Sequence, residues 1–162
     1  RYQQGYSHLQ FYYYPLGENA DKFIAKSLKN LGISGSPEKQ TLIVQGRHIE
    51  FKAYNNKIGI FTFHELCETM LGAADYLALA RRMDVIILTG IPKLQPEQHN
   101  SAKRFSTLID TFYEHKIRLI CTAAVRTEEI YQNGINSFEF QRTVSRLVEM
   151  QSPGYDERLE AI

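Results

Sequence analysis

Tryptophan is absent from the 162 residues, and cysteine occurs only twice, at Cys67 and Cys121. Two isolated cysteines in apolar contexts form neither a disulfide framework nor a zinc-ligand spacing, so they indicate a reducing compartment and no metal site. No apolar run approaches the roughly 18 residues of a membrane-spanning helix, so we expect at most a peripheral association with membranes. The net charge of +1 gives no electrostatic reason to expect a nucleic-acid partner.

Two motifs of nucleotide chemistry are also missing. The chain has no G-x-x-x-x-G-K-[ST] loop to bind phosphates, and no acidic residue follows its apolar strands to hold Mg²⁺. The strand ends "TGIP" (89–92) and "CTAAV" (121–125), where α/β sheets place their ligands, offer hydroxyls and backbone groups instead. We therefore assign no catalytic residue to this chain and predict that it alone binds and hydrolyses no ATP.

What is present is typical of a globular protein. Hydrophobic residues make up 43% of the chain, which is enough for one domain with a sizeable core. We predict a single domain or region over residues 1–152, followed by a tail over 153–162. The first residue is Arg, not Met, and we expect the chain to be part of a longer protein.

The last third of the sequence predicts a βαβ unit. Short continuous apolar runs at Val85–Leu88 and Ile117–Cys121 are typical of parallel strands that are buried on both faces. Between them a helix is predicted over Ser101–His115, with Ser101 as its N-cap. Its apolar face is Ala102, Phe105, Leu108, Ile109 and Phe112.

The remaining sequence alternates between helical and β patterns. Residues 18–32, 63–70, 73–81 and 138–152 predict helices, and 127–134 a short helix with Thr127 as its cap. The runs 41–46, 48–54 and 57–63 are rich in β-formers and predict a small antiparallel meander. The predicted fold is α/β, with α+β as the alternative: the βαβ unit in a mixed sheet, covering helices and the small meander.

Two weaker constellations have more ordinary explanations. His64 and Cys67 lie three residues apart on a predicted helix and could form a Cys–His pair, but a capped helix with a buried thiol is the commoner arrangement. Tyr12, Tyr13 and Tyr14 could stack on bases, although an aromatic strand that packs on both faces is more frequent.

Arg142 and Arg146 are the candidate site residues. They lie four residues apart on the predicted last helix, where like charges repel by a few tenths of a kcal/mol. One explanation is a solvated helix face on which Glu139 pairs with Arg142 and Glu149 pairs with Arg146. The other is an anion site, because a guanidinium group suits phosphate.

Several segments together resemble the C-terminal part of the ZapE-type AAA+ ATPases, the family that includes the mitochondrial lactation-elevated-protein homologues. The resemblance runs through "YYYPLG", "FTFHELCETMLGAADYLALA", "VIILTGIPKL", "EEIYQNG" and "FEFQRTVSRLVEMQS". It implies that the phosphate-binding loop and the Mg²⁺-holding acidic residues lie upstream of this segment. It also implies that Arg142 or Arg146 reaches a nucleotide phosphate or a subunit interface.

The resemblance further implies an ATP-binding and ATP-hydrolysing full-length protein that uses Mg²⁺ and acts on partner proteins. In bacteria the partner would be the tubulin-like division protein FtsZ, and in mitochondria the activity would serve protein quality control; a homo-oligomer is also expected. The net charge and the absence of a visible targeting segment favour the bacterial cytoplasm, with mitochondria as the alternative. A different class remains open, a stand-alone protein-interaction module without a nucleotide role that presents the meander, Thr41–Phe63, to its partner.

Overall fold

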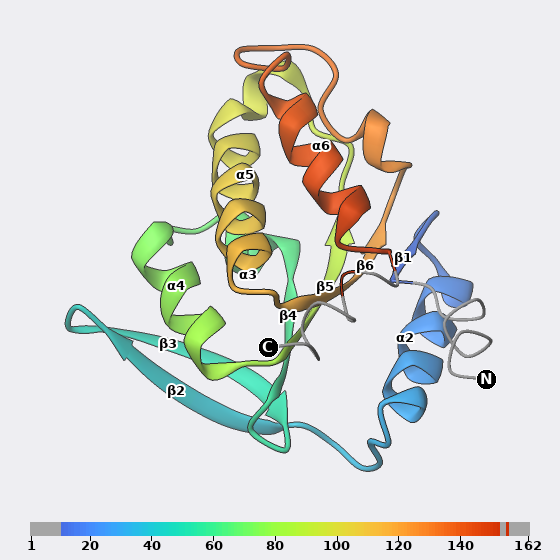
Figure 1. The fold of residues 1–162 in the computed structure, drawn as a ribbon, viewed down its shortest axis with the longest axis vertical. Coiled ribbons are helices and arrows are strands. Elements are labelled where there is room, and N and C mark those ends of the chain that lie inside the picture. Colours follow the sequence, from blue (N-terminus) through green and yellow to red (C-terminus); the bar gives the residue numbers. More distant parts are fainter. Residues whose placement is uncertain (1–10, 153–154, 156–162) are drawn as a thin grey trace.

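The computed structural model describes residues 11–152 and Tyr155. Its centre is one six-stranded mixed sheet with the strand order β1-β6-β5-β4-β3-β2 (Figure 1). The strands span Tyr12–Tyr13 (β1), Glu38–Val44 (β2), Arg47–Tyr54 (β3), Ile58–Thr62 (β4), Val85–Ile91 (β5) and Arg118–Ala123 (β6). The α/β class predicted from the sequence is confirmed.

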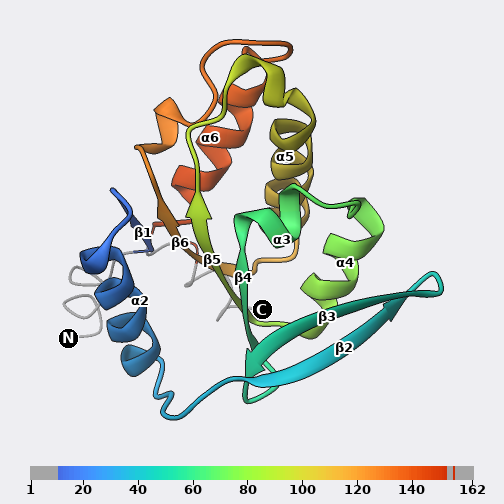
Figure 2. The same ribbon diagram turned by 180° about the vertical axis from the view of Figure 1, so that it is seen from behind.

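Helices cover both faces of the sheet unequally. Helices α3 (Phe63–Cys67), α4 (Ala73–Arg82), α5 (His99–Glu114) and α6 (Phe140–Glu149) lie on one face, and α2 (Glu18–Asn30) lies on the other (Figures 1 and 2). The larger core is therefore on the four-helix face, whereas a smaller cluster around Ile58, Ile87 and Ile120 packs against α2. None of the described helices is long and apolar enough to cross a membrane.

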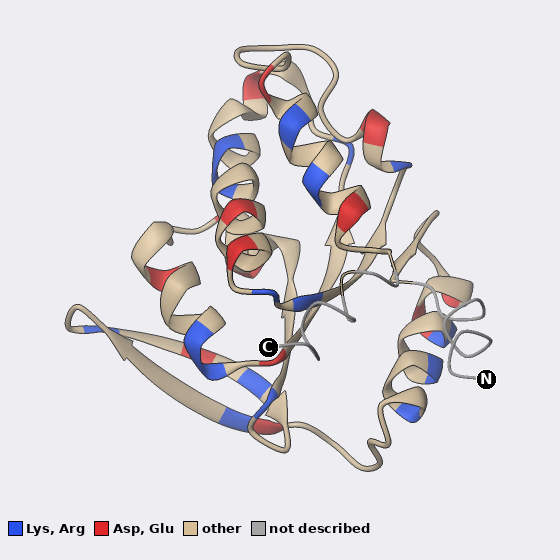
Figure 3. Cartoon of the chain, in the orientation of Figure 1, with Lys and Arg blue, Asp and Glu red and all other residues tan. Residues whose placement is uncertain are grey.

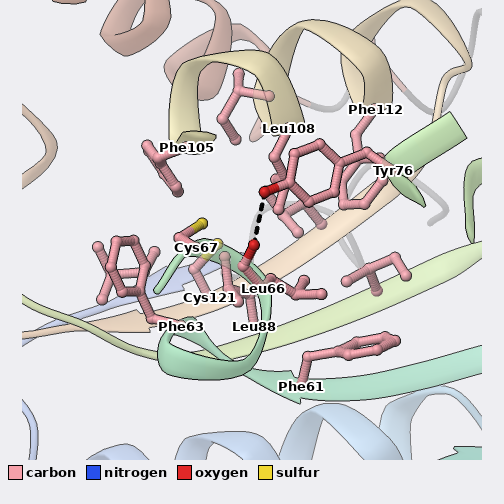
Figure 4. Packing of buried hydrophobic residues seen from close by; sticks show 14 of the residues in the cluster. Phe61, Phe63, Leu66, Cys67, Tyr76, Leu88, Phe105, Leu108, Phe112 and Cys121 are labelled. Carbon is pink, nitrogen blue, oxygen red and sulfur yellow. Dashed lines mark hydrogen bonds between the residues drawn. The ribbon is translucent and has the colours of Figure 1, made fainter. Parts of the chain in front are cut away.

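The predicted βαβ unit is confirmed. Strands β5 and β6 are parallel, with Ile86 opposite Leu119 and Leu88 opposite Cys121. All five residues of the predicted apolar face of α5 are buried; they are Ala102, Phe105, Leu108, Ile109 and Phe112. Figure 4 shows Phe105, Leu108 and Phe112 pointing from α5 into the core beside Tyr76, whose hydroxyl donates to the Leu66 carbonyl oxygen at 2.6 Å.

The predicted meander is present, but it does not form a separate unit. Strands β2, β3 and β4 are successive antiparallel neighbours. β4 also pairs in parallel with β5, with Phe61 opposite Leu88. The β2–β3 hairpin therefore extends the central sheet at one edge, where α4 packs against it (Figure 2).

Two predicted helix caps are wrong. Helix α5 begins at His99, directly after a 3₁₀ turn over Pro96–Gln98, so Ser101 lies inside the helix. The segment after β6 forms only a 3₁₀ turn, Thr127–Glu129, in which the Thr127 hydroxyl donates to the Glu128 carboxylate and makes no capping bond to a backbone amide. A 3₁₀ turn precedes the helix in the first case and replaces it in the second, and the presence of a Ser or Thr in the sequence indicates neither.

The end of the described chain is held on the core. Arg118, at the start of β6, is 5% exposed, and its guanidinium donates to the Met150 carbonyl oxygen. The same guanidinium lies over the Phe11 ring, with its Cζ 3.8 Å from the ring centroid. In the predicted tail, 153–162, Tyr155 is the one described residue; it is fully buried and its hydroxyl donates to Phe112. The other predicted tail residues lie outside the described part of the chain.

Candidate functional site

Helix α6 is attached along one side of α5. The Phe140 and Phe105 rings stack with their centroids 6.1 Å apart. One turn further on, the Thr143 hydroxyl donates to the Ser106 hydroxyl at 2.7 Å, and Thr143 is 3% exposed. These contacts set the rotation of α6 about its own axis, and so they decide where its two arginines point.

Arg146 points toward α5. Its Nη1 lies 2.6 Å from Asp110 Oδ1, and its Cζ lies 4.9 Å from the centroid of the Tyr113 ring. The Arg146 side chain is 20% exposed. A partly buried ion pair and a cation–π contact together explain why an arginine occupies this position. The carboxylate partner comes from α5, whereas the pair predicted from the sequence was within α6.

Arg142 has a different environment. Its side chain is exposed, and within the described residues its guanidinium has neither an ion pair nor a hydrogen bond. The predicted pair with Glu139 is therefore not present. Arg142 instead lines a hollow of about 280 Å³ between the start of α6 and the side of α5. The other lining residues are His99, Ala102, Lys103, Ser106, Asp110, Tyr131, Ile135, Asn136, Glu139, Phe140 and Thr143.

The charges around this hollow favour an anion. Lys103 and Arg142 are exposed cations on its rim, and Figure 3 marks basic positions on both α5 and α6. Of the two carboxylates, Asp110 is already paired with Arg146, which leaves Glu139 to oppose Lys103 and Arg142. A guanidinium and an ammonium on facing helices can together bind a phosphate or a carboxylate.

The strand ends that α/β proteins use for ligands are closed by internal hydrogen bonds here. The Thr122 hydroxyl accepts from the Gly90 amide at 3.1 Å, and the Thr89 hydroxyl donates to the Phe61 carbonyl oxygen at 3.4 Å. Gly90 has a φ of +76°, at a register shift between Leu88 and Ile91. Glu65 lines one hollow with Thr62 and Thr89 at this end of the sheet, and its carboxylate accepts from the Thr62 amide at 2.9 Å.

His64 and Cys67 do not form a catalytic pair. His64 is exposed, with its Nδ1 3.0 Å from Glu68 Oε1, while Cys67 is fully buried. Burial raises the pKa of the Cys67 thiol far above its ordinary value, which keeps it protonated and unreactive. The helix is capped by the Thr62 hydroxyl, which accepts from the Glu65 amide at 3.1 Å. The simpler prediction, a capped helix with a buried thiol, is confirmed.

Two residues of the tyrosine run, Tyr12 and Tyr13, pack within the protein. The Tyr12 hydroxyl donates to the Val125 carbonyl oxygen at 2.6 Å, and the Tyr13 ring stacks on Phe23 with centroids 5.3 Å apart. These side chains face the sheet end and α2, so the alternative of an aromatic strand that packs on both faces is supported. In the described part of the chain no cluster of three or more His, Cys, Asp or Glu side chains could hold a metal ion.

Two residues of the hollow, Lys103 and Asp110, were not among the predicted site residues. A signal for them exists in the sequence, since Lys103, Ser106 and Asp110 are spaced by three and four residues and so share one polar face of a helix. That face could be recognised as a helix-packing surface only once α6 was known to lie on it.

Comparison with known proteins identifies relatives for most of the chain. It is 36% identical over 118 residues to the Cell division protein ZapE of Escherichia coli K12, a match that covers 73% of this chain and 32% of the relative. It is 34% identical over 148 residues to the Lactation elevated protein 1 homolog B of Danio rerio, covering 72% of this chain and 29% of the relative. The chain therefore spans less than a third of the length of these relatives. No solved structure matches it.

The protein-family comparison extends almost from end to end. A family model described as AFG1-like ATPase matches residues 4–159. This agrees with the resemblance inferred from the sequence blocks, because the ZapE and lactation-elevated-protein relatives are the same two groups. The chain belongs to the AFG1-like ATPase family.

Proposed function

We propose that this chain is the C-terminal region of a longer ATPase and that Arg142 supplies it with a cation for an anionic ligand. ATP and Mg²⁺ would be bound by parts of the protein that this chain does not contain, since it carries neither a phosphate-binding loop nor acidic strand ends. The family match and the length of the relatives support the first half of the proposal.

The proposed role of Arg142 rests on the different environments of the two arginines. Arg146 is held by Asp110 and Tyr113, while Arg142 is exposed beside Lys103 without an acceptor among the described residues. The ligand is a nucleotide phosphate or a carboxylate of a neighbouring subunit. Both are oxyanions that a guanidinium binds with two hydrogen bonds.

Steady-state ATP hydrolysis by the full-length protein tests the proposal. Arg142→Ala is expected to lower turnover by about tenfold or more, as the loss of a charge stabiliser in phosphoryl transfer does. Arg81→Ala, which removes an exposed arginine from α4, is the matched control and should leave turnover unchanged. Equal turnover in the Arg142 and Arg81 variants would refute the role of Arg142.

Two further measurements refine the same proposal. A loss of turnover that grows on dilution would assign the ligand to a neighbouring subunit, whereas a weaker equilibrium affinity for ATP in the variant would assign it to the nucleotide. The 162-residue chain alone should release no phosphate from ATP. Turnover that persists through repurification in proportion to the protein would contradict the absence of a catalytic site here.

We further propose that the full-length protein acts on protein partners, either in bacterial division on the tubulin-like protein FtsZ in the cytoplasm or in mitochondrial quality control. The support is the name of one relative, Cell division protein ZapE, and the kinship with the lactation-elevated-protein group. Co-purification of the tagged full-length protein with FtsZ, lost on competition with the untagged protein, tests the bacterial version.

A protein-interaction module without a nucleotide role is the second candidate. Its support is a hollow of about 680 Å³ on the meander, lined by Lys39, Thr41, Glu50, Lys52, Ile60, Thr62 and Thr89 among others. The upstream sequence of the natural gene product separates the two candidates. A phosphate-binding loop there supports the ATPase, and its absence supports the module.

A further inference from the structure

A separate hollow, of about 260 Å³, lies between the start of α4 and the N-terminal part of α5. Its walls include the first residues of α4 and, on α5, Asn100, Lys103 and Arg104. Lys103 also lines the hollow beside α6, whereas Arg104 and Asn100 line this one alone of the two. Among the described residues that line it there is no carboxylate. Its two cations are therefore opposed by no acidic side chain on its walls.

Arg104 has an environment that packing does not explain. It is partly buried, yet within the described part of the chain its guanidinium takes part in no ion pair or hydrogen bond. Burial raises the pKa of Cys67 and of Tyr76, and the positive charge of Arg104 opposes this effect at both groups, so the guanidinium lies close to the core. A guanidinium stays charged and carries five N–H donors. The donors of Arg104 are therefore available to a ligand.

Two acidic side chains lie in the same part of the molecule, but both have other partners. Asp75, in the first turn of α4, lies 2.6 Å from Arg47 Nη2 and accepts from the Gly72 amide at 2.7 Å. Glu68 lies 3.0 Å from the Nδ1 of His64. Neither carboxylate forms an ion pair with Arg104.

The hydroxyl groups on the walls are also engaged. The Tyr76 hydroxyl donates to the Leu66 carbonyl oxygen at 2.6 Å, and the Thr107 hydroxyl donates to the Lys103 carbonyl oxygen at 3.1 Å. The side-chain donors that remain for a ligand are the guanidinium of Arg104, the ammonium of Lys103 and the amide of Asn100.

The charge of the hollow selects the kind of ligand. A phosphate group carries about −1.5 to −2 charges at neutral pH, which balances Lys103 and Arg104 together, whereas a carboxylate balances only one of them. A guanidinium can also bind two phosphate oxygens in parallel, while an ammonium acts as a point charge. We propose that the hollow between α4 and α5 binds a phosphate group, either as the free ion or as the end of a small phosphate ester. The site is distinct from Arg142 and does not depend on the role proposed for that residue.

Modification of arginines by phenylglyoxal, measured peptide by peptide with mass spectrometry, tests the proposal in the full-length protein. The reagent reacts with accessible guanidinium groups, and phosphate bound elsewhere does not affect the signal of the Arg104 peptide. Inorganic phosphate or glycerol 3-phosphate should slow the reaction at Arg104 about tenfold at saturation and leave the exposed Arg81 unchanged. Protection by one probe and not the other identifies the group as free or esterified. Acetate at the same ionic strength should protect Arg104 clearly less.

Variants of the second cation sharpen the test. Lys103→Ala should raise the phosphate concentration for half-maximal protection of Arg104 about tenfold, through the loss of one charged hydrogen bond. Lys93→Ala, which removes an exposed lysine outside the hollow, should leave that concentration unchanged. Protection of Arg142 without protection of Arg104 would place the phosphate beside α6 and overturn the proposal. Equal protection of Arg104 and Arg81, equal protection by acetate, or no reaction at Arg104 without phosphate would also overturn it.

Discussion

At the scale of single residues, the two arginines of α6 illustrate how position in a fold separates chemically identical side chains. Arg146 lies 2.6 Å from Asp110 and over the Tyr113 ring, and Arg142 one turn earlier is exposed. The repulsion expected between the two is offset for Arg146 by a carboxylate on α5. The two arginines therefore have different environments, although they lie only four residues apart on one helix.

This difference predicts opposite effects on stability and activity. Arg146→Ala should lower the free energy of unfolding by about 1 kcal/mol, because it removes a half-exposed ion pair and a cation–π contact. Arg142→Ala should change it by less than about 0.5 kcal/mol, as for an exposed side chain without a partner. Urea titration monitored by circular dichroism measures both, and equal losses would mean that Arg142 also contributes to packing.

Gly134 is a second residue whose environment decides its identity. It has a φ of +130°, and a Cβ at this position would lie 2.5 Å from the Tyr131 hydroxyl oxygen and 2.9 Å from the Pro96 Cα. Gly134→Ala should therefore destabilise the protein by about 2 kcal/mol, from backbone strain and overpacking together. Gly32→Ala, also at positive φ but with open space around it, should cost clearly less. Thermal unfolding of the two variants gives the comparison, and a larger loss for Gly32→Ala would contradict it.

At the scale of elements, α5 is central to the larger core, because it packs on α3, α4 and α6 and its buried residues share one cluster with those of the strands. Its buried face is one continuous apolar stripe, while its polar face carries Ser106 and Asp110, the partners of α6. Phe105 illustrates this position, since its ring lies within aromatic contact distance of Phe63 on α3 and of Phe140 on α6.

Leu108 is the most direct test of this element. It is fully buried at the centre of the apolar face, so Leu108→Ala should cost about 2–5 kcal/mol through lost burial and the cavity that remains. Lys103→Ala, on the exposed side of the same helix, should change stability by less than about 0.5 kcal/mol. A loss below roughly 0.5 kcal/mol for Leu108→Ala in denaturant unfolding would mean that the assigned face of α5 is wrong.

At the scale of the whole molecule, both cysteine thiols lie within the core, where Figure 4 shows Cys67 and Cys121 among aromatic and aliphatic side chains. Desolvation raises the pKa of each thiol well above its ordinary value, because the thiolate would be buried without compensation. The folded state therefore keeps both protons at a pH where the unfolded chain has lost them.

The consequence for pH dependence has a definite sign. The unfolded thiols ionise near a pKa of about 8.5, so above that pH the unfolded state binds fewer protons than the folded state, and stability falls as pH rises. Each thiol contributes a slope of about −1.4 kcal/mol per pH unit in this range, and below about pH 8 their contribution is constant. Urea unfolding between pH 7 and 10 measures the slope. Cys121→Ala should make it shallower, and an unchanged slope would show that other groups cause the alkaline loss.

The sequence alone determined the parts of this protein that depend on local pattern. The parallel pair β5 and β6, the buried face of α5, the capped helix at Phe63 and the three strands of the meander were all predicted, because period and apolar content are read over short windows. The family was recognised from blocks of residues in the same way. The caps at Ser101 and Thr127 were predicted wrongly, since 3₁₀ turns precede or replace the expected helix starts.

Only the tertiary structure decided which arginine is available and where the meander belongs. Arg146 and Asp110 are 36 residues apart in the sequence, and their pairing depends on how α6 rotates onto α5 through Phe140 and Thr143. The meander joins the central sheet because β4 pairs with β5 across the two intervening helices α3 and α4. Contacts of this kind are set by the simultaneous packing of elements that are distant in sequence, and no local pattern of residues encodes them.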